Sequence, residues 1–260
     1  MHGSTPSNPM PRVGGMAPHV LISAHRCGGA VDPAYDNTPA GVRYAASIGA
    51  DYVEFDVRRA ADGSLVCSHD AVDDPVGRPG VDEVLAEVAA CGLGAHVDLK
   101  GAGVGEWAAE LADRCAGVLD LGRVVFTTGN GRAAAVLARW AEAHEGLPLV
   151  GLTVGQSTSH LRLPAAVRAR IGELYPTRRW RDSGAGVLVA HHVLARVRLL
   201  RWAHRREVRV LVWTVDSPRV VAAALRDPRV WMVTTNRPEA ALAAREALRK
   251  KQGQTGQQVT

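Results

Sequence analysis

The sequence feature that most constrains the fold is a regular alternation, from residue 20 to residue 234, of short apolar runs with longer stretches rich in Ala, Leu and Arg. The short runs have the length of buried strands and the longer stretches that of helices. Strands that alternate with helices favour a parallel sheet, because each helix returns the chain to the same edge. We expect strands at residues 20–23, 51–57, 95–100, 123–127, 147–153, 186–190, 208–215 and 230–234.

Eight strands of this kind predict an α/β protein, a (β/α)8 TIM barrel with parallel strands. A chain of 260 residues is long enough for one such domain. An open, doubly wound sheet is the alternative. Helices are expected at residues 38–48, 105–119, 132–144 and 217–225, and two of them start with a capping residue followed by proline, Thr38-Pro39 and Ser217-Pro218.

Three further segments complete the predicted organisation. Asp62-Gly63 separates two extended runs and predicts a hairpin after the second strand. Residues 1–18 are rich in Gly, Pro and Ser, and residues 250–260 in Gln, Gly and Thr, so both are expected to be disordered tails. The barrel domain is therefore expected at residues 19–249.

Charge and composition limit the classes of partner. Lys and Arg number 31 against 26 Asp and Glu, and there is no apolar run long enough for a transmembrane segment. This balance suits nucleic acid, anionic lipid or small anionic substrates. The basic run at residues 178–181 contains an aromatic residue, as nucleic-acid contacts do, but no nucleic-acid-binding motif accompanies it. We favour a solvated helix flank, and therefore expect no nucleic-acid partner.

Cysteine usage indicates the compartment. The four cysteines form no CxxC pair, and no secretory signal precedes them. They are expected to be free thiols in a cytoplasmic protein, with chance disulfides as the alternative. The oligomeric state is not indicated.

Two carboxylates lie on the inward face of the second strand. Glu54 and Asp56 alternate with apolar side chains and therefore point into the barrel together. Buried carboxylates at this spacing repel each other unless a cation or a proton lies between them. Carboxylate oxygens are typical ligands of hard divalent cations, so such an ion is expected here. A strand end that pairs with Arg26 and Lys100 without a metal is the alternative.

Other strand ends add groups to the same mouth, because active sites of barrels lie at the carboxyl ends of the strands. Asp98 on the third strand is a candidate third metal ligand, and Lys100 follows it. His25 and Arg26 end the first strand, and His69 ends the hairpin. Metal, cations and two imidazoles suit phosphoryl transfer: Arg26 and Lys100 would neutralise phosphate oxygens while the histidines act as acid and base.

Less specific interpretations remain open for several residues. His25 and His69 could be structural, hydrogen-bonded histidines. Trp213, at the end of its strand, could be a core residue or part of a substrate pocket. His191 and His192 also follow a strand but have no partner motif, so they are expected to be loop residues.

The motifs together resemble those of the glycerophosphodiester phosphodiesterase family, whose pattern runs HRG, PENT, GAD-x-x-E-x-D, DG, HD and E-x-K. The matching segments, over roughly residues 19 to 245, begin at His25, Tyr35, Gly49, Asp62, His69, Asp98, Val212 and Thr235. The resemblance implies a TIM barrel, a metal site at Glu54, Asp56 and Asp98 for one divalent cation, Mg²⁺ or Ca²⁺, and a catalytic pair, His25 and His69. It also implies a small or lipid-derived phosphodiester substrate, cleaved through a cyclic phosphate that water then opens.

Departures from that pattern bear on the substrate. Asp98 replaces the usual Glu, and Asp-Leu-Lys resembles the related sphingomyelinase D and phospholipase D toxins, which stop at the cyclic phosphate. Cys27, Asp36 and Asn236 replace Gly, Glu and Asp, and the insertion after the second strand is short or absent. A hydrolase acting on glycerophosphodiester-like or lysophospholipid-like substrates is expected, with a cyclising lyase or a non-catalytic phosphate or phospholipid binder as alternatives.

Overall fold

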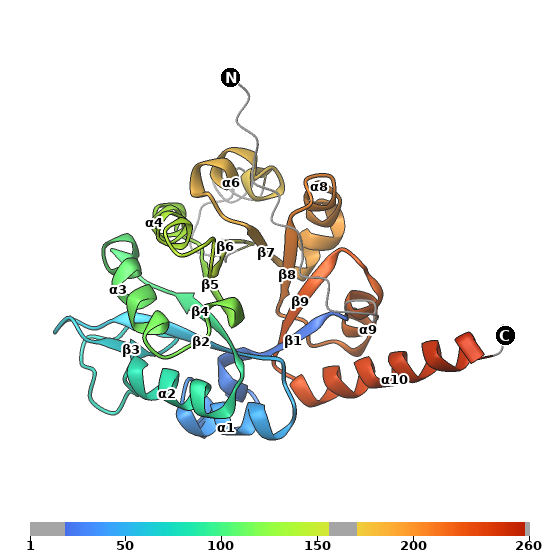
Figure 1. The fold of residues 1–260 in the computed structure, drawn as a ribbon, viewed down its shortest axis with the longest axis horizontal. Helices are drawn as coiled ribbons and strands as arrows, with labels where there is room; N and C mark the ends of the chain where they lie inside the picture. The colour runs from blue at the N-terminus through green and yellow to red at the C-terminus, as the bar shows by residue number, and fades with distance from the viewer. Residues whose placement is uncertain (1–18, 156–170, 258–260) are drawn as a thin grey trace.

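The strands form a closed barrel in the computed structural model of the chain, which describes residues 19–155 and 171–257. Because β1 pairs with both β2 and β9, the ring of parallel strands has no open edge (Figure 1). The TIM barrel is confirmed, and the open-sheet alternative is wrong. The parallel strands are β1 (Leu21–Ala24), β2 (Tyr52–Arg59), β4 (Gly94–Leu99), β5 (Val124–Thr128), β6 (Leu149–Val154), β7 (Val187–His191), β8 (Arg209–Trp213) and β9 (Val230–Thr235).

Helices surround the strands. Thr38 accepts a hydrogen bond from the backbone N–H of Gly41 and so caps the first helix, as its sequence predicted. The described helices are α1 (Pro39–Ser47), α2 (Val81–Cys91), α3 (Val104–Ala116), α4 (Gly131–Glu142), α6 (Thr177–Ser183), α7 (His192–Leu194), α8 (Leu200–His204), α9 (Pro218–Arg226) and α10 (Pro238–Gln257), with short segments η1 (His25–Gly28), η2 (Pro33–Tyr35), η3 (Leu121–Arg123) and η4 (Ala195–Leu199).

The expected hairpin follows β2. Strand β3 (Leu65–Cys67) runs antiparallel to the end of β2, and Gly63 in the turn has φ 91°. The hairpin lengthens β2 beyond the predicted strand end and brings the chain back toward the barrel mouth, where Ser68 N donates to the backbone oxygen of Asp56. This return positions His69.

The barrel has an apolar outer layer, and its interior is apolar at one end and polar at the other. Side chains such as Phe55 and Phe126, both 0% exposed, pack outward against the helices. Inside the barrel, Tyr52, Leu211 and Met232 belong to one apolar cluster. Because side chains alternate along each strand, the polar residues further along β2 and β4 share the interior with this cluster. The apolar interior therefore forms the floor beneath the polar mouth.

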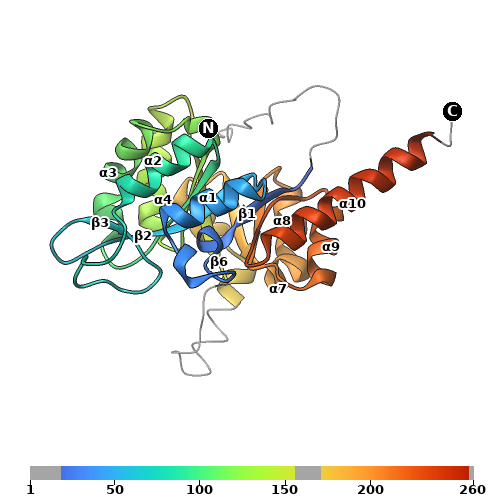
Figure 2. The ribbon, with the colours of Figure 1, turned by 90° about the horizontal axis from the view of Figure 1, so that it is seen from below.

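The last helix differs from expectation. α10 continues through residues 250–257, which we expected to be a tail, and the Lys250 ammonium lies 3.8 Å from Glu246 one turn earlier. The helix projects past the barrel (Figure 2). The tail expected at residues 1–18 lies outside the described residues. None of the described helices has the length and apolar character needed to cross a membrane.

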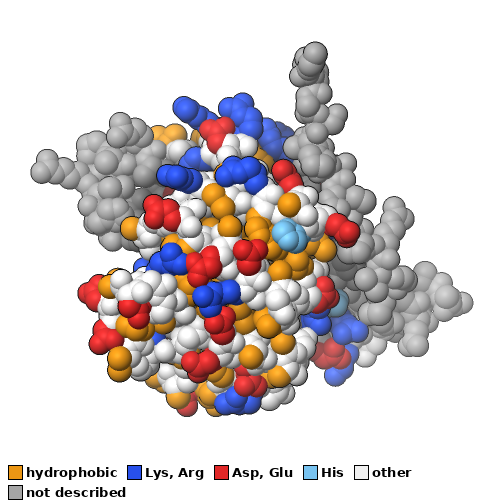
Figure 3. All heavy atoms as spheres, turned by 60° about the vertical axis from the view of Figure 1, so that its left-hand side comes forward, with side chains coloured by type: hydrophobic (Ala, Val, Ile, Leu, Met, Phe, Trp, Pro, Cys, Tyr) orange, Lys and Arg blue, Asp and Glu red, His pale blue; other side chains and the backbone are white. Residues whose placement is uncertain are grey.

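The outer surface near α2 and α3 is mixed in charge. Figure 3 shows acidic and basic side chains interspersed over the side of the molecule that lies at the left in Figure 1. Arg114 on α3 contacts both Asp82 and Glu110, at 2.6 and 3.1 Å. Exposed pairs of this kind contribute little to stability, so the structure is held mainly by its apolar layers.

Candidate active site

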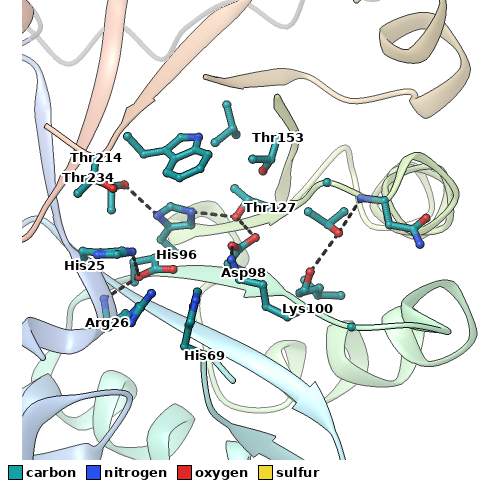
Figure 4. A pocket seen from close by; sticks show the side chains of 18 residues that line it. His25, Arg26, His69, His96, Asp98, Lys100, Thr127, Thr153, Thr214 and Thr234 are labelled. Atoms are coloured by element: carbon teal, nitrogen blue, oxygen red, sulfur yellow. Dashed lines mark hydrogen bonds and ion pairs between the residues drawn. The ribbon is translucent and has the colours of Figure 1, made fainter. Parts of the chain in front are cut away.

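A cavity of about 640 Å³ opens at the carboxyl ends of the strands (Figure 4). Seven of the eight predicted site residues line it, and the eighth, Asp56, is 1% exposed and contacts several of the lining side chains. The structure therefore brings the eight residues together at one end of the barrel. The lining residues predicted from the sequence are His25, Arg26, Glu54, His69, Asp98, Lys100 and Trp213.

Three carboxylates converge in this cavity. Glu54, Asp56 and Asp98 each offer an oxygen, and these oxygens lie within 4.8 Å of one another. β2 supplies the first two and β4 the third, with Asp56 directly opposite Asp98 in the strand register. A dispersed or outward arrangement, which would have contradicted a metal site, is not what these strands produce.

Asp56 is the most connected member of the cluster. Its Oδ2 lies 3.2 Å from His69 Nδ1 and 3.6 Å from Arg26 Nε, and its Oδ1 lies 3.2 Å from Lys100 Nζ. Burial would raise the pKa of Asp56, but the hydrogen bond from His69 and the charge of Lys100 outweigh it and hold this pKa below its usual value. Asp56 is therefore a carboxylate anchored by three cationic or imidazole side chains.

Asn37 also fixes Asp56. Its side-chain oxygen accepts a hydrogen bond of 2.7 Å from Asp56 N, and its amide nitrogen lies 3.4 Å from Asp56 Oδ2. Asn37 is 1% exposed and has a positive φ of 58°. In the sequence Asn37 stood out only as part of a motif, because nothing in its position along the chain indicated that it would meet β2.

The other two carboxylates are less well compensated. Burial, followed by the charges of Asp56 and Asp98, raises the pKa of Glu54 well above its usual value. Burial also raises the pKa of Asp98, although Lys100 Nζ lies 2.6 Å from its Oδ2. Asp56 Oδ1 accepts no well-directed hydrogen bond from the described residues. Three carboxylates offer only oxygen donors and carry excess negative charge, and such a ligand set fits a hard divalent cation.

The turn after β1 directs backbone and side chain into the mouth. Arg26 and Cys27 have positive φ values of 47° and 58°, and Arg26 N donates a hydrogen bond of 2.6 Å to Glu54 Oε2. Gly41 makes this turn possible, since a Cβ there would lie 2.6 Å from Cys27 Cβ. Cys27 itself is 0% exposed, which supports its role as a small packing residue.

A hydrogen-bond chain orients His25. Its Nδ1 lies 2.7 Å from Asn236 Oδ1, and Asn236 Nδ2 donates to Asp216 Oδ2 at 2.8 Å. Because Asp216 can only accept, the amide oxygen of Asn236 faces His25, and His25 Nδ1 must donate to it. In the neutral ring His25 Nε2 then carries no proton, and it lies 3.9 Å from Glu54 Oε2. Burial lowers the pKa of His25.

The opposite side of the cavity is neutral. Trp213 lines it together with Thr153 and Val189, and the His191 ring meets Trp213 edge-on with centroids 5.7 Å apart. Trp213 Nε1 and Thr153 Oγ1 are buried without a hydrogen-bond partner in the described part of the chain. His191 thus supports the wall, and His192 lies outside the cavity lining.

Sequence reasoning assigned no role to a buried histidine on β4. His96 lines the cavity and is 4% exposed, and burial lowers its pKa to about 3. It contacts hydroxyl groups from three other strands, β1, β5 and β9. Its inward direction was predictable from strand alternation, but its partners belong to strands distant in sequence.

Comparison with known families agrees with the motifs. Residues 25–87 match the sequence model of the "Glycerophosphoryl diester phosphodiesterase family". The resemblance to that family is confirmed. The match also confirms the expectation of a phosphoric diester hydrolase of the glycerophosphodiester phosphodiesterase type. A search of curated proteins gave no match.

Solved structures share the fold at low sequence identity. A phosphodiesterase from Oleispira antarctica, in complex with the product sn-glycerol-3-phosphate, is 18% identical, with 87% of this chain and 96% of that chain covered and a TM-score of 0.68. A glycerophosphodiester phosphodiesterase from Parabacteroides distasonis is 19% identical (89% and 99% covered, TM-score 0.68). A protein from Silicibacter pomeroyi described as a glycerophosphoryl diester phosphodiesterase is 17% identical (90% and 95%, TM-score 0.71).

Proposed function

We propose that the chain is a metal-dependent phosphodiesterase that cleaves glycerophosphodiester-like or lysophospholipid-like substrates by acid–base catalysis of His25 and His69, through a cyclic phosphate. The observation that carries the proposal is the convergence of Glu54, Asp56 and Asp98 within 4.8 Å in a cavity that both histidines line. The family match over residues 25–87 supports the reaction class. Glu54, Asp56 and Asp98 would hold one divalent cation, Mg²⁺ or Ca²⁺.

Each group of residues would have a separate role in such a reaction. A bound cation would polarise a phosphoryl oxygen. Arg26 and Lys100 would offset the negative charge of the phosphate, and both already lie beside the acidic cluster. His25 presents an unprotonated Nε2 and suits proton removal from the attacking hydroxyl. His69 Nδ1 faces the Asp56 carboxylate, and a ring held in this way suits proton donation to the leaving group.

The neutral wall would receive the alcohol part of the substrate. Trp213 provides an aromatic face, and Thr153 and Trp213 Nε1 provide polar groups. The Oleispira antarctica enzyme binds the small phosphoester sn-glycerol-3-phosphate as product, which supports a small-molecule phosphodiester here. The four cysteines are free, as expected for the cytoplasm that we propose as the compartment.

Activity assays test the proposal. We expect hydrolysis of bis(p-nitrophenyl) phosphate or glycerophosphocholine with Mg²⁺ or Ca²⁺ and loss of activity with chelator. The variant Glu54→Gln, which keeps the shape of the side chain but removes its charge, should no longer respond to added metal. No activity on a broad panel of diesters, with His25→Ala unchanged in every respect, would instead identify a phosphate-binding barrel.

Product analysis tests the second part of the mechanism. Asp98-Leu99-Lys100 is the feature that favours a cyclising lyase. Phosphorus NMR of the reaction distinguishes a monoester product from a cyclic phosphate that accumulates. If the cyclic phosphate accumulates, the roles proposed for the metal and the histidines stand, but the step in which water opens the cyclic phosphate is removed from the mechanism.

A further inference from the structure

His96 and Thr127 connect the acidic cluster to the far side of the barrel. His96 Nε2 lies 3.0 Å from Thr127 Oγ1, and Thr127 Oγ1 lies 2.8 Å from Asp98 Oδ1. On the other side of the ring, His96 Nδ1 lies 3.3 Å from Ser23 Oγ and 3.4 Å from Thr234 Oγ1. Figure 4 shows the part of this chain that runs from Thr234 through His96 and Thr127 to Asp98.

The direction of each hydrogen bond follows from the chemistry of the groups. Lys100 Nζ, which can only donate, lies 2.6 Å from Asp98 Oδ2, and Asp98 Oδ1 accepts from Thr127 Oγ1 at 2.8 Å. Thr127 has one hydroxyl proton and must give it to Asp98. Thr127 Oγ1 therefore accepts from His96 Nε2–H, and His96 Nδ1, which carries no proton, accepts from the hydroxyls of Ser23 and Thr234.

We propose that Thr127 and His96 are positioning residues that fix the carboxylate of Asp98 for the divalent cation. This inference rests on the proposed function. Thr127 lies directly opposite Asp98 in the β4–β5 register, so its hydroxyl reaches the carboxylate from the neighbouring strand. His96 holds that hydroxyl from the side away from Asp98 and leaves it a single direction in which to donate.

Asp98 needs this support more than the other two carboxylates do. Glu54 accepts from the backbone N–H of Arg26, and Asp56 is held from several sides by His69 and Asn37. The remaining contact of Asp98 in the described residues is Lys100, whose ammonium lies 2.6 Å from Oδ2 and leaves Oδ1 to be held by another group. The Thr127 hydroxyl supplies that contact at Oδ1, so that each oxygen of the short side chain is held.

We call the hydrogen-bonded series His96–Thr127–Asp98 the relay. Metal binding measured by titration calorimetry tests it without any assay of turnover. We expect Thr127→Val, which keeps the shape but removes the hydroxyl, to weaken Mg²⁺ or Mn²⁺ binding about 10- to 100-fold. Thr127→Ser should restore the affinity to within about threefold of wild type, because the hydroxyl returns. The matched control is Thr153→Val, which removes a buried hydroxyl that has no partner in the described chain and should leave the affinity unchanged.

The tautomer of His96 tests the relay itself, with or without metal. Nitrogen-15 NMR of the histidine rings should show a proton on His96 Nε2 and none on Nδ1, and the Nε2 signal should shift in Thr127→Val. His96→Gln, whose side-chain amide can still donate to Thr127, should retain most of the metal affinity, with folding checked by thermal melting.

Each outcome decides between the two proposals. Wild-type affinity in Thr127→Val, equal loss in Thr127→Val and Thr127→Ser, or a proton on His96 Nδ1 overturns the relay and leaves the phosphodiesterase intact. A wild-type protein that binds no divalent cation overturns the proposed function instead, and the NMR measurement then still decides whether the relay exists.

Discussion

The two sides of the barrel mouth carry different kinds of side chain. β1, β2 and β4, with the hairpin, supply the imidazoles, carboxylates and cations that face the cavity, whereas β5 to β9 supply hydroxyls, Val189 and Trp213. Reaction chemistry is therefore concentrated on three adjacent strands. The other strands shape the cavity and, through Thr127, hold a charged group from the neutral side.

Electrostatics explains why the two kinds of residue are separated. A buried charge needs a partner within a few ångströms, because desolvation is costly. Lys100 lies between Asp56 and Asp98, and Arg26 beside Asp56, so these two carboxylates each meet a cation from the same or a neighbouring strand, whereas Glu54 accepts from the backbone N–H of Arg26. A single carboxylate on β6 or β7 would have no such neighbour among the cavity-lining residues.

The largest expected effect comes from the histidines of the charged side. His25→Ala and His69→Ala should each lower kcat by roughly 10²- to 10⁴-fold, because each removes a proton-transfer group. The double variant should lose less than the product of the two single effects, because the two groups act in one reaction. Steady-state kinetics at saturating metal measures this. His144→Ala, on the exposed stack with Trp140, is the matched control. Full activity in either single variant would remove that histidine from the mechanism.

The next effect concerns stability on the neutral side. Leu211 is 0% exposed in the apolar floor, so Leu211→Ala should lower the free energy of unfolding by about 2–5 kcal/mol through lost burial and the cavity left behind. Denaturant unfolding monitored by circular dichroism measures the change. Val76→Ala, at a side chain that is 82% exposed, should change it little. A loss below about 1 kcal/mol for Leu211→Ala would indicate that the floor repacks.

The charged side was also the part of the site that the sequence predicted. Glu54, Asp56 and Asp98 stand out because carboxylates rarely face the interior of a strand pattern, and alternation gives their direction. The eight parallel strands and the hairpin were predictable for the same reason, since apolar runs and Asp62-Gly63 are local signals.

Apart from Trp213 at the end of its strand, the neutral side offered no comparable signal. Thr127 and Thr153 occur in ordinary apolar strands, where threonine is common, and their roles depend on which strand lies opposite.

Asn37 and Asn236 act from loops, and their partners, Asp56 and His25, are 19 and 211 residues away. The extension of α10 past residue 250 was missed because polar composition was taken as disorder, although Lys and Gln are good helix formers.

A smaller effect should reverse the usual sign of a core substitution. Because three carboxylates crowd within 4.8 Å, Glu54→Gln should raise the unfolding free energy of the metal-free protein by about 1 kcal/mol while abolishing metal-dependent activity. Thermal melting in chelator, with and without added Mg²⁺, measures both effects: the variant should melt higher than wild type in chelator and gain little from the metal. A variant that is less stable in chelator would show that Glu54 is already compensated by Arg26 N.

The smallest effect tests the same kind of substitution where the carboxylate is well paired. Asp227, between α9 and β9, accepts from Arg229 Nε at 2.8 Å and from its terminal nitrogen at 2.6 Å, and this hydrogen bonding lowers the pKa of Asp227. A lowered folded-state pKa gives stability that is present above the unfolded value of about 3.9 and is lost as the pH falls through the folded value. Asp227→Asn should therefore destabilise the protein at pH 7 by about 0.5 kcal/mol, opposite in sign to Glu54→Gln. Melting curves recorded from pH 7 downward should bring variant and wild type together at the acidic end, once the pH has fallen through the folded-state pKa of Asp227 and the wild-type side chain is protonated as well. A difference that persists there would have to come from the shape of the side chain, and the contrast between crowded and paired carboxylates would no longer rest on charge.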